Sequence, residues 1–327
     1  MEAIQVVGAG GIGCAVGYAL KAAGVPVIFV DANPRKIKAG QRDGVEVVGH
    51  APLTAEFRLF AHWQPPPGAT VLQCTKCYDN AAVLSKLRSD VTLIPIQNGF
   101  DPSLAEQGHE FEGIASFVSE CAPDRPRTRI TREGDLHLGR LHARGPVARA
   151  LPAALAPLWT ATLFRVVPVA DIEPFKYAKL MYNAAISPLA AAAGIDNGQL
   201  LSAPSARRLF FGLLQENHRI LSAAGVKLGR IGPFHPRTVT WILGRKWLAD
   251  GMAKAFEPSL RGTYCSMAGE IEKGRTEIDN YNGYLIRLAV RTGTPCPLNR
   301  AVYDLVTRMT VECVRPSPEA WQRLTAA

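Results

Sequence analysis

The first half of the chain alternates short apolar runs with stretches in which apolar residues recur at helical spacing. Four of the runs have the length of a buried strand: Ile4–Val7, Val25–Val30, Ala69–Cys74 and Val91–Ile96. The apolar stretch Gly13–Ala23 separates the first two and suits a crossover helix. Short strands that alternate with helices are typical of a parallel sheet with helical connections. The pattern therefore predicts an N-terminal α/β domain.

The segment Phe117–Gly139 has a different pattern, because it is polar, rich in arginine and interrupted by the turn signal Gly134-Asp135. We expect an antiparallel hairpin here that closes the sheet. Its densest positive stretch, Asp124–Arg132, holds four arginines among nine residues. A solvated hairpin or loop accounts for that stretch.

After about Val169 helical spacing becomes continuous. We expect the following helices in this half: Lys176–Ala193, Ser205–Ala224, Pro236–Asp250, Pro258–Lys273 and Thr276–Thr292. Thr276 precedes Asp279 at the spacing of a capping box, and Gly225 and Gly293 stand where helices end. The sequence therefore predicts two domains, an α/β domain over residues 1–168 and an all-helical domain over residues 169–327.

The composition suits a globular chain, with 47% hydrophobic and 20% charged residues over 327 positions. No apolar run approaches the ~20 residues of a membrane helix, and the strand-like run at Ile4 leaves no room for a signal peptide. Seven scattered cysteines do not indicate a disulfide framework. We therefore expect a cytoplasmic protein without a membrane partner.

The net charge of +9 arises from 37 Lys and Arg residues against 28 Asp and Glu residues. The positive residues form no long block of the kind that binds nucleic acid, so we expect no nucleic-acid partner. A basic balance also suits an anionic cofactor and a carboxylate substrate.

A glycine-rich motif follows the first predicted strand. Its residues, Gly8-Ala9-Gly10-Gly11-Ile12-Gly13, match the G-x-G-x-x-G fingerprint of dinucleotide-binding domains. In that fingerprint the first glycine allows a tight turn, the second lets the backbone approach a pyrophosphate, and the third lets the helix pack on the strand. The helix N-terminus then offers N–H groups to the phosphates. The first domain is therefore expected to be of the Rossmann type.

Asp31 ends the second predicted strand, where an acidic residue accepts hydrogen bonds from the ribose hydroxyls of NAD. The 2′-phosphate of NADP would face this carboxylate, and two unit charges ~4 Å apart repel by roughly 4 kcal/mol at an effective dielectric constant of 20. Arg35 and Lys36 could offset that repulsion if they pointed inward, but a solvated helix start is the favoured interpretation. We therefore expect NAD(H) to be preferred, with NADP(H) left open.

Several further motifs follow one another in a specific order. They are Cys74-Thr75-Lys76, Ile96-Gln97-Asn98-Gly99, the helical set Lys179, Asn183 and Ser187, then Asn197-Gly198, Ser266-Met267, Thr276-Glu277-Ile278-Asp279 and Asn282-Gly283. In order and spacing the chain resembles the ketopantoate reductase family, the 2-dehydropantoate 2-reductases. The resemblance implies reduction of 2-dehydropantoate to pantoate by hydride transfer from a nicotinamide cofactor. A small-molecule 2-oxo acid is then the expected partner, and a homodimer stays open.

The resemblance also implies roles for individual residues. Lys179 matches the catalytic lysine that protonates the developing alkoxide. The substrate-contacting positions are Asn98, Asn183, Ser187, Asn197 and Ser266. The cofactor-contacting positions outside the glycine loop and Asp31 are Lys76, Asn98 and Glu277.

The residue types agree with these roles. Lys179, Asn183 and Ser187 recur every four residues, so one helix face carries an acid and two hydrogen-bonding groups. General acid catalysis of this kind contributes ~10²–10⁴-fold. Structural alternatives stay open, because a lysine can snorkel to the surface and Asn98 before Gly99 suits a turn. Glu277 could favour a helix N-terminus, and Ser266 could bond its own backbone.

Three features depart from the family pattern. Ser187 stands where the family usually carries a second asparagine, and Asp31 stands where NADP-using members typically carry arginine. The segment Ser119–Arg132 lacks the usual glycine-rich pattern. The identity of the 2-oxo acid and the cofactor preference therefore stay open.

Other constellations are weaker. Cys74-x-x-Cys77 has metal or redox spacing, but no second pair accompanies it, so we expect no metal. Two alternative functions remain: reduction of another 2-oxo acid on the same fold, or a non-catalytic NAD-sensing module. A sensor has no need of an acid such as Lys179 beside the nicotinamide.

Overall fold

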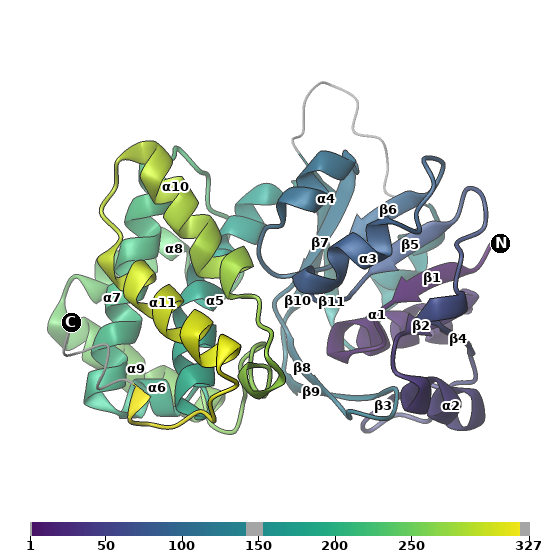
Figure 1. Cartoon of the computed structure of the whole chain (residues 1–327), viewed down its shortest axis with the longest axis horizontal. Helices are drawn as coiled ribbons and strands as arrows, with labels where there is room; N and C mark the ends of the chain where they lie inside the picture. The colour runs from purple at the N-terminus through teal and green to yellow at the C-terminus, as the bar shows by residue number, and fades with distance from the viewer. Residues whose placement is uncertain (1, 142–152, 321–327) are drawn as a thin grey trace. The chain divides into compact units, whose positions relative to one another are not determined.

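The computed structural model describes residues 2–141 and 153–320 (Figure 1). The chain divides into two compact units. The first unit comprises Met1–Gln97 and Asp101–Ile172, and the second comprises Asn98–Phe100 and Glu173–Ala327. Within the described ranges, no helix is long and apolar enough to cross a membrane.

A five-stranded parallel sheet forms the centre of the first unit. Its strand order is β4-β2-β1-β5-β6. The bounds are β1 (Ile4–Val7), β2 (Val27–Asp31), β4 (Glu56–Leu59), β5 (Thr70–Gln73) and β6 (Thr92–Pro95). Strands buried on both faces need continuous apolar runs, and all four residues of β1 are buried. The four predicted strands are confirmed; β4, whose residues alternate between exposed and buried, was not predicted.

Short helices connect these strands. They are α1 (Gly11–Ala22), α2 (Pro34–Asp43) and α3 (Asn80–Leu84), with the 3-10 turns η1 (Phe60–His62) and η2 (Cys77–Asp79). After β6, the unit also contains α4 (Pro102–Gln107) and the 3-10 turn η3 (Ala153–Thr160). Gly17 lets α1 lie close to the sheet, because a Cβ there would collide with the ring of Phe29. Asn33 caps α2 by accepting a 2.9 Å hydrogen bond from the N–H of Arg35.

The predicted hairpin over Phe117–Gly139 is correct only in part. An antiparallel pair does form between β8 (Val118–Cys121) and β9 (Arg127–Arg132), but it joins β3 (Glu46–Val47) in a separate sheet rather than closing the parallel one. Gly134 is needed for a close backbone approach, since a Cβ there would lie 2.5 Å from the Phe117 nitrogen.

A third sheet contains the last residues of the segment predicted as a hairpin. β10 (Asp135–Arg140) pairs antiparallel with β7 (Phe111–Ala115) and parallel with β11 (Arg165–Asp171). Asp135 therefore begins a strand of a different sheet instead of forming a turn. β11 continues past Pro168, the last residue of the predicted first domain, and the first unit ends at Ile172.

The second unit is helical apart from its connections. Its helices are α5 (Glu173–Ala193), α6 (Gln199–Ser202), α7 (Pro204–Ala223), α8 (Pro236–Leu243), α9 (Lys246–Leu260), α10 (Tyr284–Thr292) and α11 (Pro297–Val311), with the 3-10 turn η4 (Ile271–Lys273) and the π-helical turn η5 (Asp279–Gly283). The predicted fold class, a Rossmann-type sheet domain followed by a helical domain, is confirmed.

Several predicted helix bounds are wrong. The range Pro236–Asp250 is split between α8 and α9, and Pro258 lies in the last turn of α9 instead of starting a helix. No α-helix continues from Leu260 to Lys273, because Gly262 and Gly269 have φ of 70° and 69°, which interrupts helical hydrogen bonding.

Two more features of the second unit differ from expectation. Thr276 forms no capping box, since η5 begins at Asp279 with no side-chain cap. Helix α11 was not predicted at all. By contrast, Gly225 and Gly293 do follow α7 and α10 with φ of 68° and 66°, as predicted for helix ends.

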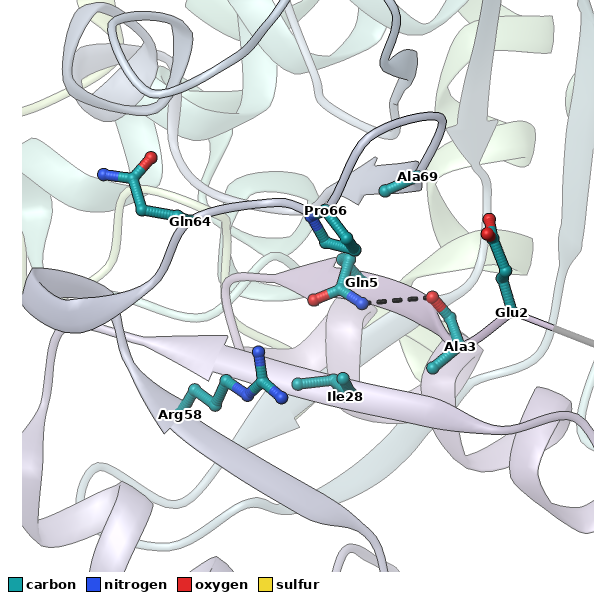
Figure 2. Close-up of a pocket in the computed structure, with 8 residues that line it drawn as sticks. All are labelled: Glu2, Ala3, Gln5, Ile28, Arg58, Gln64, Pro66 and Ala69. Carbon is teal, nitrogen blue, oxygen red and sulfur yellow. Dashed lines mark hydrogen bonds between the residues drawn. The ribbon is translucent and has the colours of Figure 1, made fainter.

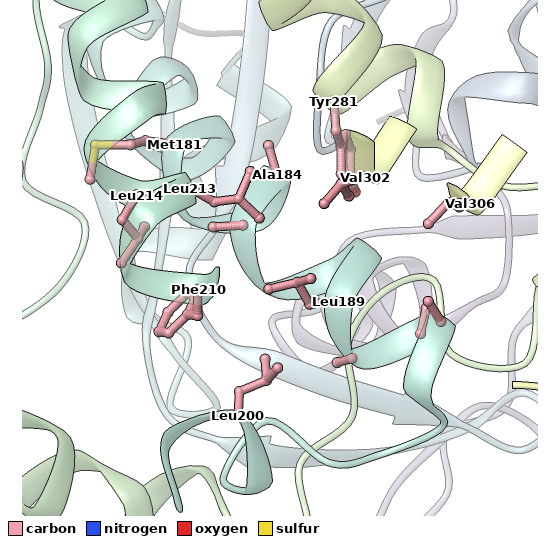
Figure 3. Packing of buried hydrophobic residues seen from close by; sticks show 14 of the residues in the cluster. Met181, Ala184, Leu189, Leu200, Phe210, Leu213, Leu214, Tyr281, Val302 and Val306 are labelled. Atoms are coloured by element: carbon pink, nitrogen blue, oxygen red, sulfur yellow. The ribbon is translucent and has the colours of Figure 1, made fainter. Parts of the chain in front are cut away.

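The core of the second unit surrounds α5. Figure 3 shows buried side chains from α5, α7 and α11, among them Met181, Leu213 and Val302. Buried polar groups hold the same helices together. Glu216 of α7 accepts a 2.8 Å hydrogen bond from the backbone N–H of Asn299 in the first turn of α11, where an acidic group satisfies otherwise unpaired donors.

Candidate active site

The glycine loop has the geometry that the dinucleotide fingerprint requires. Gly8 has a φ of 95°, and a Cβ there would lie 2.8 Å from the Thr75 nitrogen. A Cβ at Gly13 would collide with the Gly8 carbonyl oxygen. Gly10 caps α1 without a side-chain hydrogen bond, and nothing lies within 4 Å of the position of its Cβ. The start of α1 is therefore open to a phosphate group.

The other loop positions are held by neighbouring elements. A Cβ at Gly11 would lie 2.6 Å from Oγ of Ser119, so β8 covers this side of the loop. The carbonyl of Ala9 accepts hydrogen bonds from Sγ of Cys14 at 3.3 Å and Sγ of Cys121 at 3.5 Å. A hydrogen bond with Cys121 and burial raise the pKa of the Cys14 thiol. Ile12 is half-buried at the second position of α1.

Asp31 stands at the end of β2, as predicted, and its carboxylate contacts the loop. Oδ2 accepts a 2.9 Å hydrogen bond from the Ala9 N–H, and Oδ1 accepts one of 2.9 Å from the Asn33 N–H. The expectation that both basic neighbours are solvated is wrong for Lys36, whose Nζ donates to the Ala9 carbonyl at 3.0 Å. Arg35 does point outward, with its side chain 80% exposed.

A buried amide cluster holds the ends of β5 and β6 together. Oδ1 of Asn80 accepts hydrogen bonds from Nε2 of Gln73 at 2.7 Å and from Nε2 of Gln97 at 2.8 Å. Nε2 of Gln97 also donates to the Thr75 carbonyl at 2.7 Å. Thr75 and Gln97 directly precede Lys76 and Asn98, so the cluster fixes the backbone next to both predicted contact residues.

Asn80 was missed by the sequence analysis. A signal was present, because Gln73 ends an otherwise apolar strand and a buried amide needs a partner. Neither member of the nearby Cys74-x-x-Cys77 motif offers an accessible thiolate, since burial raises the pKa of Cys74 to about 12 and Cys77 is buried. Over residues 2–141 and 153–320, no group of three His, Cys, Asp or Glu residues could hold a metal ion.

One pocket of the first unit lies away from the predicted site residues. It is lined by Gln5, Ile28 and Arg58 among others, and Gln5 donates to the Ala3 carbonyl at 3.1 Å (Figure 2). Gln5 and Ile28 lie near the beginnings of β1 and β2, whereas the glycine loop follows the end of β1.

Asn98 belongs to the second unit, together with Gly99 and Phe100. The N–H of Phe100 donates to the Asn280 carbonyl at 3.1 Å, and Nδ2 of Asn280 donates to the Phe100 carbonyl at 3.2 Å. Gly99 has a φ of 77°, and a Cβ there would lie 2.8 Å from the ring of Tyr281. Only glycine allows the segment to approach this ring so closely.

Helix α5 carries three predicted residues on one face. Lys179 and Asn183 are half-buried, and Ser187 is buried. A second lysine, Lys176, was not singled out by the sequence analysis. It is buried one turn before Lys179, and its Nζ lies 4.8 Å from the centre of the Phe100 ring.

The remaining predicted residues of the second unit are joined by side-chain hydrogen bonds. Oγ of Ser266 lies 3.4 Å from Oγ of Ser187 and 3.1 Å from the hydroxyl of Tyr281. That hydroxyl donates to Oε2 of Glu277 at 3.2 Å. Asn197 is buried and lies outside this set of hydrogen bonds. Its Nδ2 donates to Oγ1 of Thr263 at 3.1 Å.

Comparisons with known proteins agree on one family. The family model described as "Ketopantoate reductase PanE/ApbA" matches residues 4–139, and its C-terminal counterpart matches residues 171–310. The 2-dehydropantoate 2-reductase of Archaeoglobus fulgidus is 25% identical over 94% of this chain and 97% of its own length. The corresponding protein of Pyrobaculum aerophilum is 26% identical over 93% and 96%.

Solved structures share the fold. The ternary structure of a D-mandelate dehydrogenase with NADH and anilino(oxo)acetate has a TM-score of 0.75 and 17% identity, over 95% of this chain and 99% of that chain. A PanE/ApbA family ketopantoate reductase from Ralstonia eutropha has a TM-score of 0.73 and 23% identity over the same shares. A dimeric ketopantoate reductase from Staphylococcus aureus has a TM-score of 0.70 and 18% identity, over 95% and 100%.

Proposed function

Because the chain belongs to the ketopantoate reductase family, whose members reduce a 2-oxo acid with a nicotinamide cofactor, we propose that it reduces 2-dehydropantoate to pantoate with NADH. The observation that carries the proposal is the face of α5, where Lys179 and Asn183 stand one turn apart in the helical unit that also holds Asn98.

The first unit offers a place for the cofactor. The uncapped start of α1 and the open space at Gly10 suit a pyrophosphate, and the carboxylate of Asp31 suits ribose hydroxyls. When bound, the nicotinamide supplies the hydride that reduces the ketone carbon. The residues of the chain then have to orient the acid and supply a proton.

Lys179 is the proposed proton donor. Reduction of a ketone places negative charge on its oxygen, and the ammonium group of Lys179 stabilises that charge and transfers a proton to the oxygen, which gives the 2-hydroxy acid. Asn183 and Asn98 orient the substrate through hydrogen bonds. Ser187 and Ser266, whose Oγ atoms lie 3.4 Å apart, are further proposed substrate contacts.

A preference for NADH is the finer part of the proposal. Asp31 disfavours the 2′-phosphate of NADPH by charge repulsion. Lys36 weakens this effect because it places a positive charge 3.7 Å from the same carboxylate. Nζ of Lys36 is committed to the Ala9 carbonyl, and its side chain is only 11% exposed, so it offers little surface to a bound phosphate.

Steady-state kinetics with a panel of 2-oxo acids, each with NADH and NADPH, tests the proposal. We expect 2-dehydropantoate with NADH to give the highest kcat/KM. A higher value for another acid would instead support the second candidate, a reductase of a different 2-oxo acid, which the serine at position 187 favours. Tight NADH binding without turnover of any acid would support a sensing module.

A homodimer is proposed as the assembly, because a similar structure is of a dimeric enzyme. Sedimentation equilibrium over a range of concentrations tests this. A monomer at every concentration would contradict it.

A further inference from the structure

Tyr281 links residues that the sequence analysis had identified separately. Its side chain is fully buried, and its hydroxyl lies between Glu277, at 3.2 Å from Oε2, and Ser266, at 3.1 Å from Oγ. Ser266 is in turn 3.4 Å from Ser187. Four side chains from three segments thus form one line of hydrogen bonds that ends at a carboxylate.

The carboxylate of Glu277 determines which hydroxyl group donates in each hydrogen bond of this line. The hydroxyl of Tyr281 has a single proton, which it donates to Oε2 of Glu277. In the bond between Tyr281 and Ser266, the serine must then be the donor. Since Ser266 also has a single hydroxyl proton, it can only accept from Ser187 and from any further partner.

This direction decides what Ser266 can recognise. Ser266 is half-buried, whereas Ser187 and Tyr281 are buried, so Ser266 is the member of the line with the most exposed surface. With its proton held by Tyr281, its oxygen offers lone pairs. It therefore suits a hydrogen-bond donor on the substrate, such as a hydroxyl group, rather than the substrate carboxylate.

We propose that Tyr281 is a positioning residue that orients the Ser266 hydroxyl and thereby selects 2-oxo acids that carry a hydroxyl group. The proposal rests on the function proposed above and on the placement of Ser266 at the substrate. Without the Tyr281 hydroxyl, Ser266 can rotate and either donate or accept. Selectivity for a substrate hydroxyl then falls, because the site is no longer built around one hydrogen-bond direction.

The test compares two acids that differ by one hydroxyl group. 2-Dehydropantoate carries the hydroxyl, and 3,3-dimethyl-2-oxobutanoate replaces its hydroxymethyl group by a hydrogen-bond-inert methyl group. In wild-type protein we expect a higher kcat/KM for 2-dehydropantoate. In Tyr281→Phe the ratio of the two values should fall about tenfold, the effect of one oriented hydrogen bond.

Two further variants separate positioning from general damage. Tyr303→Phe removes a hydroxyl that donates to Oδ1 of Asp279 at 3.2 Å, and it should leave the ratio unchanged. Ser266→Ala should lower the ratio by itself, and Tyr281→Phe should then have no further effect on it. A cooperative thermal unfolding transition shows that each variant is folded. If Tyr281→Phe does not fold, Ser266→Ala still tests the line of hydrogen bonds that joins Ser266 to Tyr281 and Glu277.

The outcomes distinguish the two proposals. A wild-type protein that reduces neither acid overturns the proposed function and the role of Tyr281 with it. A wild-type protein that reduces both acids, with the same ratio in Tyr281→Phe, overturns the role of Tyr281 alone. An effect of Tyr281→Phe that persists in the Ser266→Ala background also overturns it, because Tyr281 would then not act through Ser266.

Discussion

Lys36 turns its ammonium group towards Asp31, with 3.7 Å between Nζ and Oδ2. The two side chains are only 11% and 15% exposed, so water screens their interaction weakly. The positive charge of Lys36 therefore partly compensates the negative charge of Asp31, the residue that is expected to select NADH. Removal of Lys36 and removal of Asp31 should therefore shift the preference between NADH and NADPH in opposite directions.

Lys36→Met should increase the preference for NADH, measured as the ratio of kcat/KM for NADH to that for NADPH. The expected change is on the order of tenfold, a fraction of the roughly 4 kcal/mol between unit charges at this range. Asp31→Ala should lower the ratio. Arg35→Met is the control, because Arg35 is exposed and pairs with Asp124 at 3.4 Å. A Lys36→Met protein that shifts towards NADPH would contradict this explanation.

Asn282 should be essential for the stability of α5. Pro188 has no N–H, so the carbonyl of Ala184 loses its donor within the helix. Nδ2 of Asn282 donates to that carbonyl at 2.9 Å and also to Oδ1 of Asn299 at 2.9 Å. Asn282→Ala leaves both buried acceptors without this donor, and denaturant unfolding should show a loss of about 2–4 kcal/mol.

A double-mutant cycle tests that cause. Pro188→Ala restores a backbone N–H one turn after Ala184, so it can replace the donor that Asn282→Ala removes. The cost of Asn282→Ala should therefore be smaller in the Pro188→Ala background by about 1 kcal/mol. Equal costs in both backgrounds would mean that Asn282 stabilises the unit by other contacts.

The protein should become less stable in mild acid, partly because of His137. Burial lowers the pKa of His137, which is 3% exposed in β10. As the pH falls below about 6.5, the unfolded chain takes up a proton before the folded chain does. The free energy of unfolding then falls. The contribution of His137 to the free energy of unfolding is fully present above the pKa that this histidine has in the unfolded chain. It is lost as the pH falls towards the lower pKa in the folded chain.

Comparison of wild type with His137→Gln isolates the effect, since carboxylates contribute equally to both proteins. The free energy of unfolding should decrease less in His137→Gln between about pH 7 and pH 5. Parallel pH profiles would show that His137 does not take part.

The parallel sheet could be predicted because its signals are local. The apolar runs at Ile4–Val7 and Val91–Ile96 are long enough to mark buried strands, and the glycine spacing at Gly8–Gly13 marks the turn between β1 and α1. The face of α5 is equally local, because residues four apart share one side of a helix.

The remaining features depend on contacts between distant segments. Nothing near Asp135 indicates that it begins a strand beside β7 and β11. The direction of Lys36 follows from the position of the Ala9 carbonyl, and the importance of Tyr281 follows from Ser266 and Gly99. Such relationships require the folded chain.

Turnover by Lys179→Ala tests the central claim most directly. Lys176→Ala is the matched control, because it removes a lysine one turn earlier on α5. With NADH and the best 2-oxo acid, Lys179→Ala should lower kcat by ~10²–10⁴-fold while NADH binding persists, since the proton donor acts mainly in the transition state. Lys176→Ala should keep a kcat at least about tenfold higher than Lys179→Ala. A folded Lys179→Ala protein that binds NADH and retains near-normal kcat would contradict the claim.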